Sequence, residues 1–273
     1  MSNYLRAKKL ELAKPNEYLM VNRLYTAVEG EGTTIGQPKW FLRFQGCSVG
    51  CKWCDSKETW KFKGFEIADF ETEQHSMFKL VENDFDAFAK HLRNEAPNIH
   101  HISITGGEPL QQNLDLLEKL VEKLHRHNFV LQIETSGQTT PTSQTKRILD
   151  AIGMNNGLVS VDFKTPSSGI DANMDMIVQA LKTARSHGRI PVQLKAVVSN
   201  ETDYQVAKKA YNELMPIYSR IEYLITPCWP PGKEMQLGPA WFKMFIQDDE
   251  WYSMPKVIMQ QHKTIFGTRD LDS

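Results

Sequence analysis

Three cysteines, Cys47, Cys51 and Cys54, lie within one stretch of eight residues. At spacings of four and three residues, their thiolates can face one small inorganic cluster from a single loop. A [4Fe-4S] cluster normally takes four cysteine ligands, so three cysteines leave one iron open to a non-protein ligand. An open iron beside a bound cofactor indicates chemistry, whereas a fully ligated cluster indicates electron transfer alone.

The same cysteines also allow a structural zinc site. Cys228, the one other cysteine, or one of the eight histidines could supply a fourth ligand. Zinc sites usually present two separate pairs of ligands, and the sequence offers no second pair. A disulfide is disfavoured because three thiols so close together leave an odd one. The spacing therefore favours an iron–sulfur cluster and leaves zinc as an alternative.

The composition limits the classes of partner. The chain has 273 residues, of which 41% are hydrophobic, enough for one large domain or two small ones. Its formal net charge of −1 provides no basic field for a polyanion, so we expect no nucleic acid partner. Residues 1–14 contain no continuous apolar run like that of a signal peptide, and no stretch approaches the roughly 20 apolar residues that span a bilayer. We therefore expect no membrane partner and a reducing, cytoplasmic location, where thiols stay available to metal.

The elements that must position the cysteines alternate between strand-like apolar runs and helical patterns. This alternation predicts an α/β fold with a mostly parallel sheet. Six strands are expected, which indicates a barrel or part-barrel, at 40–44, 101–105, 129–134, 158–163, 192–198 and 221–225. Helices are expected at about 113–127, 173–186 and 203–214. We predict a single domain over 1–273, with an insertion at 57–96 that has a helix near its end, and a short C-terminal extension.

Four polar motifs each follow a predicted strand directly. They are the cysteine loop, Gly106-Gly-Glu-Pro109, Glu134-Thr-Ser136 and Asp162-Phe-Lys164. Because the carboxyl ends of parallel strands form the active-site rim in such folds, we expect these motifs to surround one pocket. Alone, Gly-Gly-Glu-Pro indicates a tight turn. Beside the cysteine loop, its glycines favour close approach of a ligand, and its carboxylate can hold a ligand's ammonium group.

Two basic side chains are placed where a ligand could meet them. Arg43 lies in a strand that is otherwise apolar, so its burial requires an anionic partner, and an anionic substrate group is a reasonable one. Lys164 ends another strand near Asp162, which suits contact with a carboxylate or a ribose. His262, near the C-terminus, is expected to be structural when it is considered alone.

The cysteine motif, with Trp53 before its last cysteine, resembles the signature of radical S-adenosylmethionine (SAM) enzymes, and Gly-Gly-Glu-Pro is its known companion. The resemblance narrows to the 7-carboxy-7-deazaguanine synthase family of the queuosine pathway. It extends from about Tyr18 to Phe266 and rests on four further stretches: Thr26-Ala-Val-Glu-Gly-Glu-Gly32, residues 43–56, Gln132-Ile-Glu-Thr-Ser-Gly137 and Gln260-Gln-His-Lys263.

The resemblance implies an incomplete (β/α) barrel of about six parallel strands and a particular reaction. In this family the open iron of the cluster binds SAM, and one electron cleaves SAM to methionine and a 5′-deoxyadenosyl radical. That radical takes a hydrogen from 6-carboxy-5,6,7,8-tetrahydropterin, whose ring contracts to 7-carboxy-7-deazaguanine with loss of ammonia. The cofactor supplies the difficult chemistry and the protein positions it. The family further implies Mg²⁺, a homodimer, and an electron donor of the flavodoxin or ferredoxin type.

Site residues follow from the resemblance by motif position. The cluster ligands would be Cys47, Cys51 and Cys54, and the hydroxyl of Ser56 would bind Mg²⁺. SAM would be lined by Trp53, Cys54, Asp55, Gly107, Glu134, Ser136, Asp162, Phe163 and Lys164. The pterin would be held by Val28, Glu29, Gly30, Glu31, Arg43, Thr105, Gln261 and His262. In that set, Arg43 would pair with the pterin carboxylate.

Two positions depart from the family pattern. Ser56 replaces a threonine and keeps its oxygen, whereas Glu29 replaces a glutamine and so exchanges an amide donor for a carboxylate acceptor. Cys228 has no role in the pattern and is expected to be a core or loop thiol. Two rival functions remain: an activase that installs a glycyl radical on a partner protein, and a non-catalytic zinc or iron–sulfur scaffold. The activase would lack a pterin-sized pocket with Arg43, and the scaffold would not cleave SAM.

Overall fold

The computed structural model describes residues 15–61, 68–70, 77–187, 192–230 and 233–266. The strands are β1 (Leu19–Val28), β2 (Pro38–Phe44), β3 (Ala68–Asp69), β4 (Phe78–Leu80), β5 (His101–Gly106), β6 (Val130–Thr135), β7 (Leu158–Phe163), β8 (Val192–Val198), β9 (Glu222–Pro227) and β10 (Lys256–Val257). The α-helices are α2 (Phe85–Glu95), α3 (Leu114–Arg126), α4 (Ser143–Met154), α5 (Met174–His187), α6 (Glu201–Leu214), α7 (Pro239–Gln247) and α8 (Gln261–Phe266).

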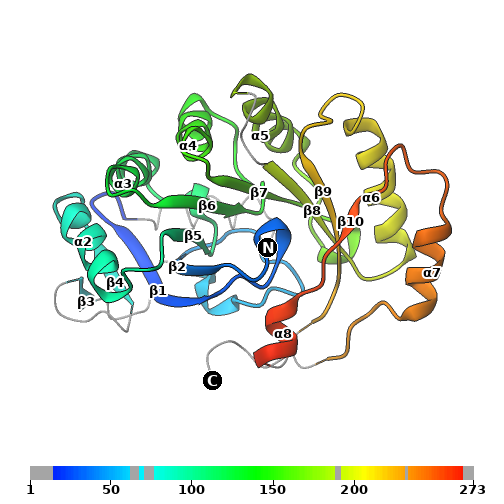
Figure 1. The fold of residues 1–273 in the computed structure, drawn as a ribbon, viewed down its shortest axis with the longest axis horizontal. Coiled ribbons are helices and arrows are strands. Elements are labelled where there is room, and N and C mark those ends of the chain that lie inside the picture. Colours follow the sequence, from blue (N-terminus) through cyan, green and yellow to red (C-terminus); the bar gives the residue numbers. More distant parts are fainter. Residues whose placement is uncertain (1–14, 62–67, 71–76, 188–191, 231–232, 267–273) are drawn as a thin grey trace.

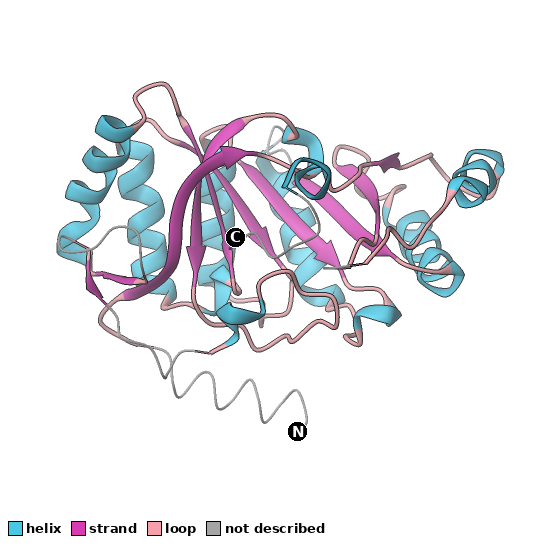
Figure 2. Cartoon of the chain, turned by 90° about the horizontal axis from the view of Figure 1, so that it is seen from below, coloured by secondary structure: helices cyan, strands magenta, loops and turns pink. Residues whose placement is uncertain are grey.

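The described strands join in one open sheet, in the order β10-β9-β8-β7-β6-β5-β2-β1-β4-β3. Its central strands β2, β5, β6, β7, β8 and β9 are parallel, which confirms the six predicted strands. β1 pairs antiparallel with β2, and β4 pairs antiparallel with β1. Helices α2 to α6 lie along the outside of the curved sheet (Figure 1), and the view from below shows the strands side by side between flanking helices (Figure 2). The predicted incomplete barrel is therefore confirmed.

Side chains of the parallel strands alternate between two environments, as strand geometry requires. One set packs against the helices and is fully buried and apolar, as in Leu42, Ile104, Ile133, Val161 and Leu194. The other set faces the inside of the arc, and its polar members are Lys39, Arg43, Ser103, Thr105, Gln132, Glu134, Ser160, Asp162, Gln193 and Lys195. Parallel strands that are covered on both faces are usually apolar throughout, so this set marks a polar interior.

The outer helices form where apolar residues recur three and four positions apart. In α3, Leu117, Leu120 and Leu124 are fully buried, and the Asn113 side chain caps the first turn by accepting from the Leu116 N–H. The ends of α3, α5 and α6 lie within one or two residues of the predicted ends. Within the described residues, no helix has the length and apolar character needed to cross a membrane.

Several elements were not predicted from the sequence. The alternation in β1 is interrupted by an irregularity in its pairing between Val21 and Arg23. The apolar face of α4 is short, and this helix begins at a capping box formed by Thr142 and Thr145. The short elements β3, β4, β10, α7 and α8 were also absent from the prediction, because they contain too few residues to show a period.

The segment 57–96, which we predicted to be an insertion, contributes to the main core. Phe78 and Leu80 of β4 and Phe85 and Phe88 of α2 are buried in the same cluster as the parallel strands. α2 lies beside α3 on the outside of the sheet (Figure 1), which confirms the predicted helix near the end of this segment. Residues 62–67, 71–76 and the extension after Phe266 lie outside the described residues.

Candidate active site

A cavity of about 280 Å³ lies inside the arc, where the loops that follow β2, β5, β6 and β7 meet. All four polar motifs contribute to it, as the sequence predicted. The predicted site residues that line it are Val28, Glu29, Gly30, Glu31, Arg43, Cys47, Cys51, Trp53, Cys54, Asp55, Ser56, Thr105, Gly107, Glu134, Ser136, Asp162, Lys164 and His262.

Two predicted site residues, Phe163 and Gln261, do not line the cavity. Phe163 is buried on the helix side of β7, where its ring meets Tyr211 edge-on with centroids 6.1 Å apart. Strand alternation turns it away because Asp162 faces the interior. Gln261 is exposed on α8, whereas Gln260 is buried and donates a hydrogen bond of 2.6 Å to Glu31 Oε1. Gln260 therefore occupies the place that we had predicted for Gln261.

The cysteine loop is fixed to the fold by backbone hydrogen bonds. Gly46 N–H donates to the Thr59 carbonyl at 2.6 Å, and Lys52 N–H donates to the Ser168 carbonyl at 3.0 Å. None of the three clustered cysteines forms a disulfide with a described residue; Cys47 and Cys51 are buried and Cys54 is half-buried. Their position on one wall of the cavity is therefore set by the surrounding structure.

The donor set fits an iron–sulfur cluster. Burial raises the pKa of Cys47 to about 12, with a smaller contribution from Glu108, and burial also raises the pKa of Cys51. Buried thiolates therefore need a positive partner, which the irons of a cluster provide. Within the described residues, no three His, Cys, Asp or Glu side chains lie close enough to hold a single metal ion. Cys228 is buried and does not line the cavity, as expected for a core thiol.

The Gly106-Gly107 turn is pressed against the start of the cysteine loop. Gly107 N–H donates to the Phe44 carbonyl at 2.8 Å, and Glu108 N–H donates to the Gly46 carbonyl at 2.9 Å. A Cβ on Gly107 would lie 2.2 Å from the Gly46 carbonyl oxygen. The glycine thus allows the two backbones to approach, and this contact positions the cysteine loop.

Glu108 does not act as we expected. Its carboxylate is fully buried and accepts from the Leu110 N–H at 3.1 Å, the Thr135 hydroxyl at 2.7 Å, and both the N–H and the hydroxyl of Ser136. It does not line the cavity, so it is not placed to hold an ammonium group of a ligand. Instead, it joins the loop after β5 to the loop after β6.

Lys195, which the sequence did not predict to be a site residue, connects two carboxylates in the cavity. Its Nζ lies 2.6 Å from Glu31 Oε2 and 3.3 Å from Asp162 Oδ1, while Lys164 lies 2.7 Å from Asp162 Oδ2. Burial alone would raise the pKa of Glu31, but Lys195 and then His262 lower it below its usual value. Lys164 and Lys195 likewise overcome the effect of burial on the pKa of Asp162, which is lowered.

Replacing Lys195 with methionine is expected to lower the free energy of unfolding by about 3 kcal/mol at neutral pH, because the variant removes the cation nearest to the partly buried Glu31 and one of the two cations beside Asp162. In the wild type, the pKa values of Glu31 and Asp162 are lower in the folded than in the unfolded chain. These carboxylates therefore stabilise the fold at any pH above their unfolded-state pKa values, and the stabilisation is lost as the pH falls toward their folded-state values. In the variant these pKa values rise, so its deficit should shrink once acid protonates the carboxylates.

Urea denaturation of both proteins between pH 4 and pH 8 measures this effect. Lys256→Met is the matched control, because Lys256 pairs with Glu222 at 2.7 Å on the surface and its removal should cost less than about 1 kcal/mol. A deficit for Lys195→Met that equals that of the control, or that grows in acid, would contradict the prediction.

Aromatic and basic side chains form the wall around Arg43. Tyr25 and Phe41 line the cavity with their rings stacked 5.3 Å apart, and Arg43 Nη2 donates to the Tyr25 hydroxyl at 3.1 Å. Glu58 Oε1 lies 3.6 Å from Arg43 Nη1, so a carboxylate of the protein is the anionic neighbour within reach. This combination of flat rings and a guanidinium suits a planar ligand with an anionic group.

The helix α8 closes one side of the cavity. Gln261 N–H donates to the Gly30 carbonyl at 2.9 Å, and His262 lies so close that a Cβ on Gly30 would be 2.6 Å from its Nδ1. Lys263 Nζ lies 2.9 Å from Asp55 Oδ2 and also donates to the Trp229 carbonyl. Residues 260–263 therefore connect the loop that contains Gly30 to Asp55, which directly follows the cysteine loop.

Comparison with known proteins adds to this geometry. A family model described as a 4Fe-4S single cluster domain matches residues 28–176, which is more than half of the chain. A relative named 7-carboxy-7-deazaguanine synthase, from Buchnera aphidicola subsp. Schizaphis graminum, is 36% identical over 123 residues. That match covers 44% of this chain and 55% of the relative, so the chain spans about half the length of the curated relatives it matches first.

Solved structures show the same fold. The crystal structure of QueE from Escherichia coli superposes with a TM-score of 0.61 and 22% sequence identity, covering 96% of this chain and 99% of that chain. A radical SAM methyltransferase from Sphaerobacter thermophilus superposes with a TM-score of 0.54 and 16% identity, covering 91% of this chain and 81% of that chain. The sheet and its helices therefore have the fold of radical SAM proteins.

Proposed function

This chain belongs to the family of 4Fe-4S single cluster domains, and from that premise we propose that it is a radical SAM lyase acting on a pterin. The proposed reaction converts 6-carboxy-5,6,7,8-tetrahydropterin to 7-carboxy-7-deazaguanine with release of ammonia, in queuosine biosynthesis. The observation that carries the proposal is that one cavity is lined both by the three clustered cysteines and by an aromatic wall that contains Arg43. The relatives named 7-carboxy-7-deazaguanine synthase support the choice of substrate.

The residues divide the cavity between cofactor and substrate. Cys47, Cys51 and Cys54 would hold the cluster, which together with SAM supplies radical chemistry when bound. SAM would lie against the loop residues that follow the strands, namely Trp53, Asp55, Gly107, Ser136, Asp162 and Lys164. Asp162 and Lys164 form an ion pair at 2.7 Å, which stabilises the charged form of both side chains. This wall therefore offers both a hydrogen-bond acceptor and a donor.

The substrate side would use the charges already present on the opposite wall. Arg43 can donate two N–H groups to the pterin carboxylate, while the stacked rings of Tyr25 and Phe41 form an apolar surface beside it. Glu29 and Glu31 offer acceptor oxygens for the N–H groups of the ring. Glu134, which the resemblance assigns to SAM, is linked to Glu29 through the Gln132 amide, and we propose that it serves the substrate as well. With α8 on one side, the cavity limits the access of water to the reacting atoms.

The proposal extends to further components. The Ser56 hydroxyl lines the cavity two residues after Cys54 and would bind Mg²⁺ with substrate oxygens completing the shell. We propose a flavodoxin or ferredoxin as electron donor and a homodimer as the assembly, both supported by the resemblance in sequence. The clustered cysteines form no disulfide among the described residues, which supports the proposal of a reducing, cytoplasmic location.

The test uses the full chain, reconstituted with iron and sulfide without oxygen, and incubated with SAM, dithionite and Mg²⁺, with and without the pterin. We expect 7-carboxy-7-deazaguanine to form only when the pterin is present. Cleavage of SAM with the pterin left unchanged would favour the glycyl-radical activase. An iron-loaded protein that does not cleave SAM would leave only the metal-binding scaffold.

A further inference from the structure

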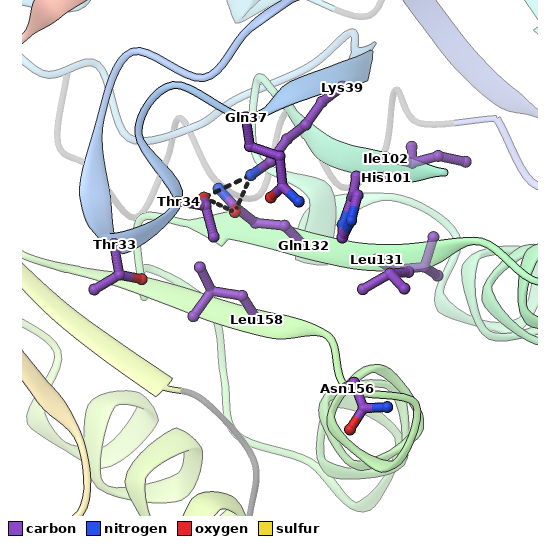
Figure 3. Close-up of a pocket in the computed structure, with 11 residues that line it drawn as sticks. Thr33, Thr34, Gln37, Lys39, His101, Ile102, Leu131, Gln132, Asn156 and Leu158 are labelled. Carbon is purple, nitrogen blue, oxygen red and sulfur yellow. Dashed lines mark hydrogen bonds between the residues drawn. The ribbon is translucent and has the colours of Figure 1, made fainter. Parts of the chain in front are cut away.

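A buried lysine lies beneath the substrate side of the cavity and was not recognised from the sequence. Lys39, on β2, has an exposed fraction of 1%, and its Nζ lies 3.1 Å from Glu29 Oε2. It also donates to the Thr34 hydroxyl at 2.7 Å and to Gln132 Oε1 at 2.5 Å. Figure 3 shows Lys39, Thr34 and Gln132 joined by these hydrogen bonds. The three donors of the ammonium group therefore meet three acceptors.

The cation determines which way the Gln132 amide faces. Because an ammonium group can only donate, the amide oxygen must point toward Lys39, and the Thr34 hydroxyl donates to the same oxygen at 3.0 Å. The amide nitrogen then points toward the cavity, where it donates to Glu29 Oε2 and to Glu134 Oε1, each at 3.0 Å. One amide group thus connects two carboxylates that line the cavity.

The two carboxylates depend on this arrangement. Burial and then the charge of Glu134 raise the pKa of Glu29 to about 7, although Lys39 acts to lower it. The charged groups that face Glu29 are Lys39 on β2, Glu134 on β6 and Glu31 in the same loop. Without the lysine, the charged groups that remain are Glu134 and Glu31, and both raise the pKa of Glu29 and so favour its protonated form. A flipped Gln132 amide would also turn its oxygen toward the two carboxylates.

We propose that Lys39 is a positioning residue that fixes the Gln132 amide and favours the ionised form of Glu29, so that Glu29 and Glu134 present acceptor oxygens to the N–H groups of the substrate. This inference rests on the proposed function for the identity of the substrate. Lys39 acts through Gln132 and Glu29, because it does not line the cavity itself. It also gives the carboxylate at position 29 a buried cation as its partner.

A second cavity makes Lys39 reachable from the opposite end of the strands. This cavity of about 200 Å³ is lined by Lys39, Gln132, His101 and Asn156 (Figure 3). His101, Val130 and Leu158 are the first residues of their strands, so the opening lies at the amino ends of the parallel strands. A small amine that enters there could replace the ammonium group of a shortened side chain.

The first test measures the ionisation of Glu29 in protein without substrate, by isotope-edited infrared spectroscopy of the glutamate carboxylates. The Glu29→Gln variant identifies the signal that belongs to Glu29. We expect a midpoint near pH 7 in the wild type and a higher midpoint in Lys39→Met, because the variant loses a cause that lowers the pKa. An unchanged midpoint in Lys39→Met would overturn the proposal, whatever the enzyme turns out to catalyse.

The second test measures turnover in the same proteins. For Lys39→Met, the KM for the pterin should rise about 10- to 100-fold at pH 7 and fall again as the pH rises and ionises Glu29. Cleavage of SAM in the absence of pterin should stay at the wild-type rate. Equal loss of both activities would indicate a structural role and contradict the proposal. If wild-type protein does not act on the pterin, the proposed function fails while the infrared result still decides the role of Lys39.

Chemical rescue separates positioning from packing. In Lys39→Ala, we expect millimolar ethylammonium or propylammonium to return the Glu29 midpoint and the KM toward wild-type values, because the second cavity leads to the vacated space. Propanol, which carries no charge, should not rescue this variant. Lys39→Met fills the space and should not respond to either compound. Rescue by propanol, or the absence of rescue by any alkylammonium ion, would count against the proposal.

Discussion

The Cys51→Ala variant is expected to lose the iron–sulfur cluster and, with it, all measurable cleavage of SAM. Cys51 is the middle thiol of a loop that the fold already holds on one wall of the cavity, and its removal leaves only Cys47 and Cys54 as thiolate ligands in that loop. The measurement is iron and sulfide content after anaerobic reconstitution, together with 5′-deoxyadenosine formation. Retention of full iron content and cleavage would contradict the ligand assignment.

Cys228→Ala is the matched control for this prediction. Cys228 is buried, like Cys47 and Cys51, but does not line the cavity, so its replacement should leave iron content and SAM cleavage unchanged. The control also tests the alternative of a zinc site, in which Cys228 would supply the fourth ligand. Loss of metal from both variants, with zinc found in the wild type, would support that alternative.

The Gly107→Ala variant is expected to lower the free energy of unfolding by about 1–3 kcal/mol or more and to prevent assembly of the cluster. The added Cβ would lie 2.2 Å from the Gly46 carbonyl oxygen, which is backbone and cannot rotate away. The loop that begins at Gly46 must then move, and it carries all three cysteines. Urea denaturation and iron content measure the two effects.

Gly238→Ala provides the control, because a Cβ there would meet no atom within 4 Å. This variant should keep the wild-type iron content and should change the free energy of unfolding by less than about 0.5 kcal/mol. A Gly107→Ala protein that assembles the cluster normally would show that the cysteine loop does not depend on its contact with the turn after β5.

The sequence predicted the central architecture because each of the six parallel strands contains several apolar residues in a short run. Leu42, Ile104, Ile133, Val161 and Leu194 alternate with other residues along their strands, and this alternation survives in the structure. β1 was missed because its pairing is irregular between Val21 and Arg23, so no simple alternation is visible. The assignment of 57–96 as an insertion in one domain stays a prediction, although the described part of this segment belongs to the core.

Site residues could be predicted from the sequence only where they belong to a short motif that directly follows a strand. The cysteine loop, Glu134, Ser136 and Asp162 follow strands directly and therefore lie near one another at the strand ends. Lys39, Gln132 and Lys195 lie within strands, and the signal that could have identified them is a polar residue at every second position of an otherwise apolar strand. Read in that way, the same alternation that predicts the strands also predicts a polar interior.

Other features depend on contacts between distant parts of the chain, which no local pattern contains. Glu108 resembles a ligand-binding carboxylate in the sequence, but Thr135 and Ser136 occupy its oxygens in the fold. Gln260 and Gln261 are neighbours of the same type, and only the docking of α8 on Gly30 decides which of them faces Glu31.

The position of α8 in the chain has a consequence for biosynthesis. All strands that carry the cysteine loop and the cavity walls precede residues 260–263, which connect the Gly30 loop to Asp55. During translation, the ribosome therefore releases the cysteine loop about 200 residues before the helix that closes over it. A nascent chain can fold its sheet with that side of the cavity still open. Delivery of iron and sulfide to the thiols is then least obstructed before synthesis is complete.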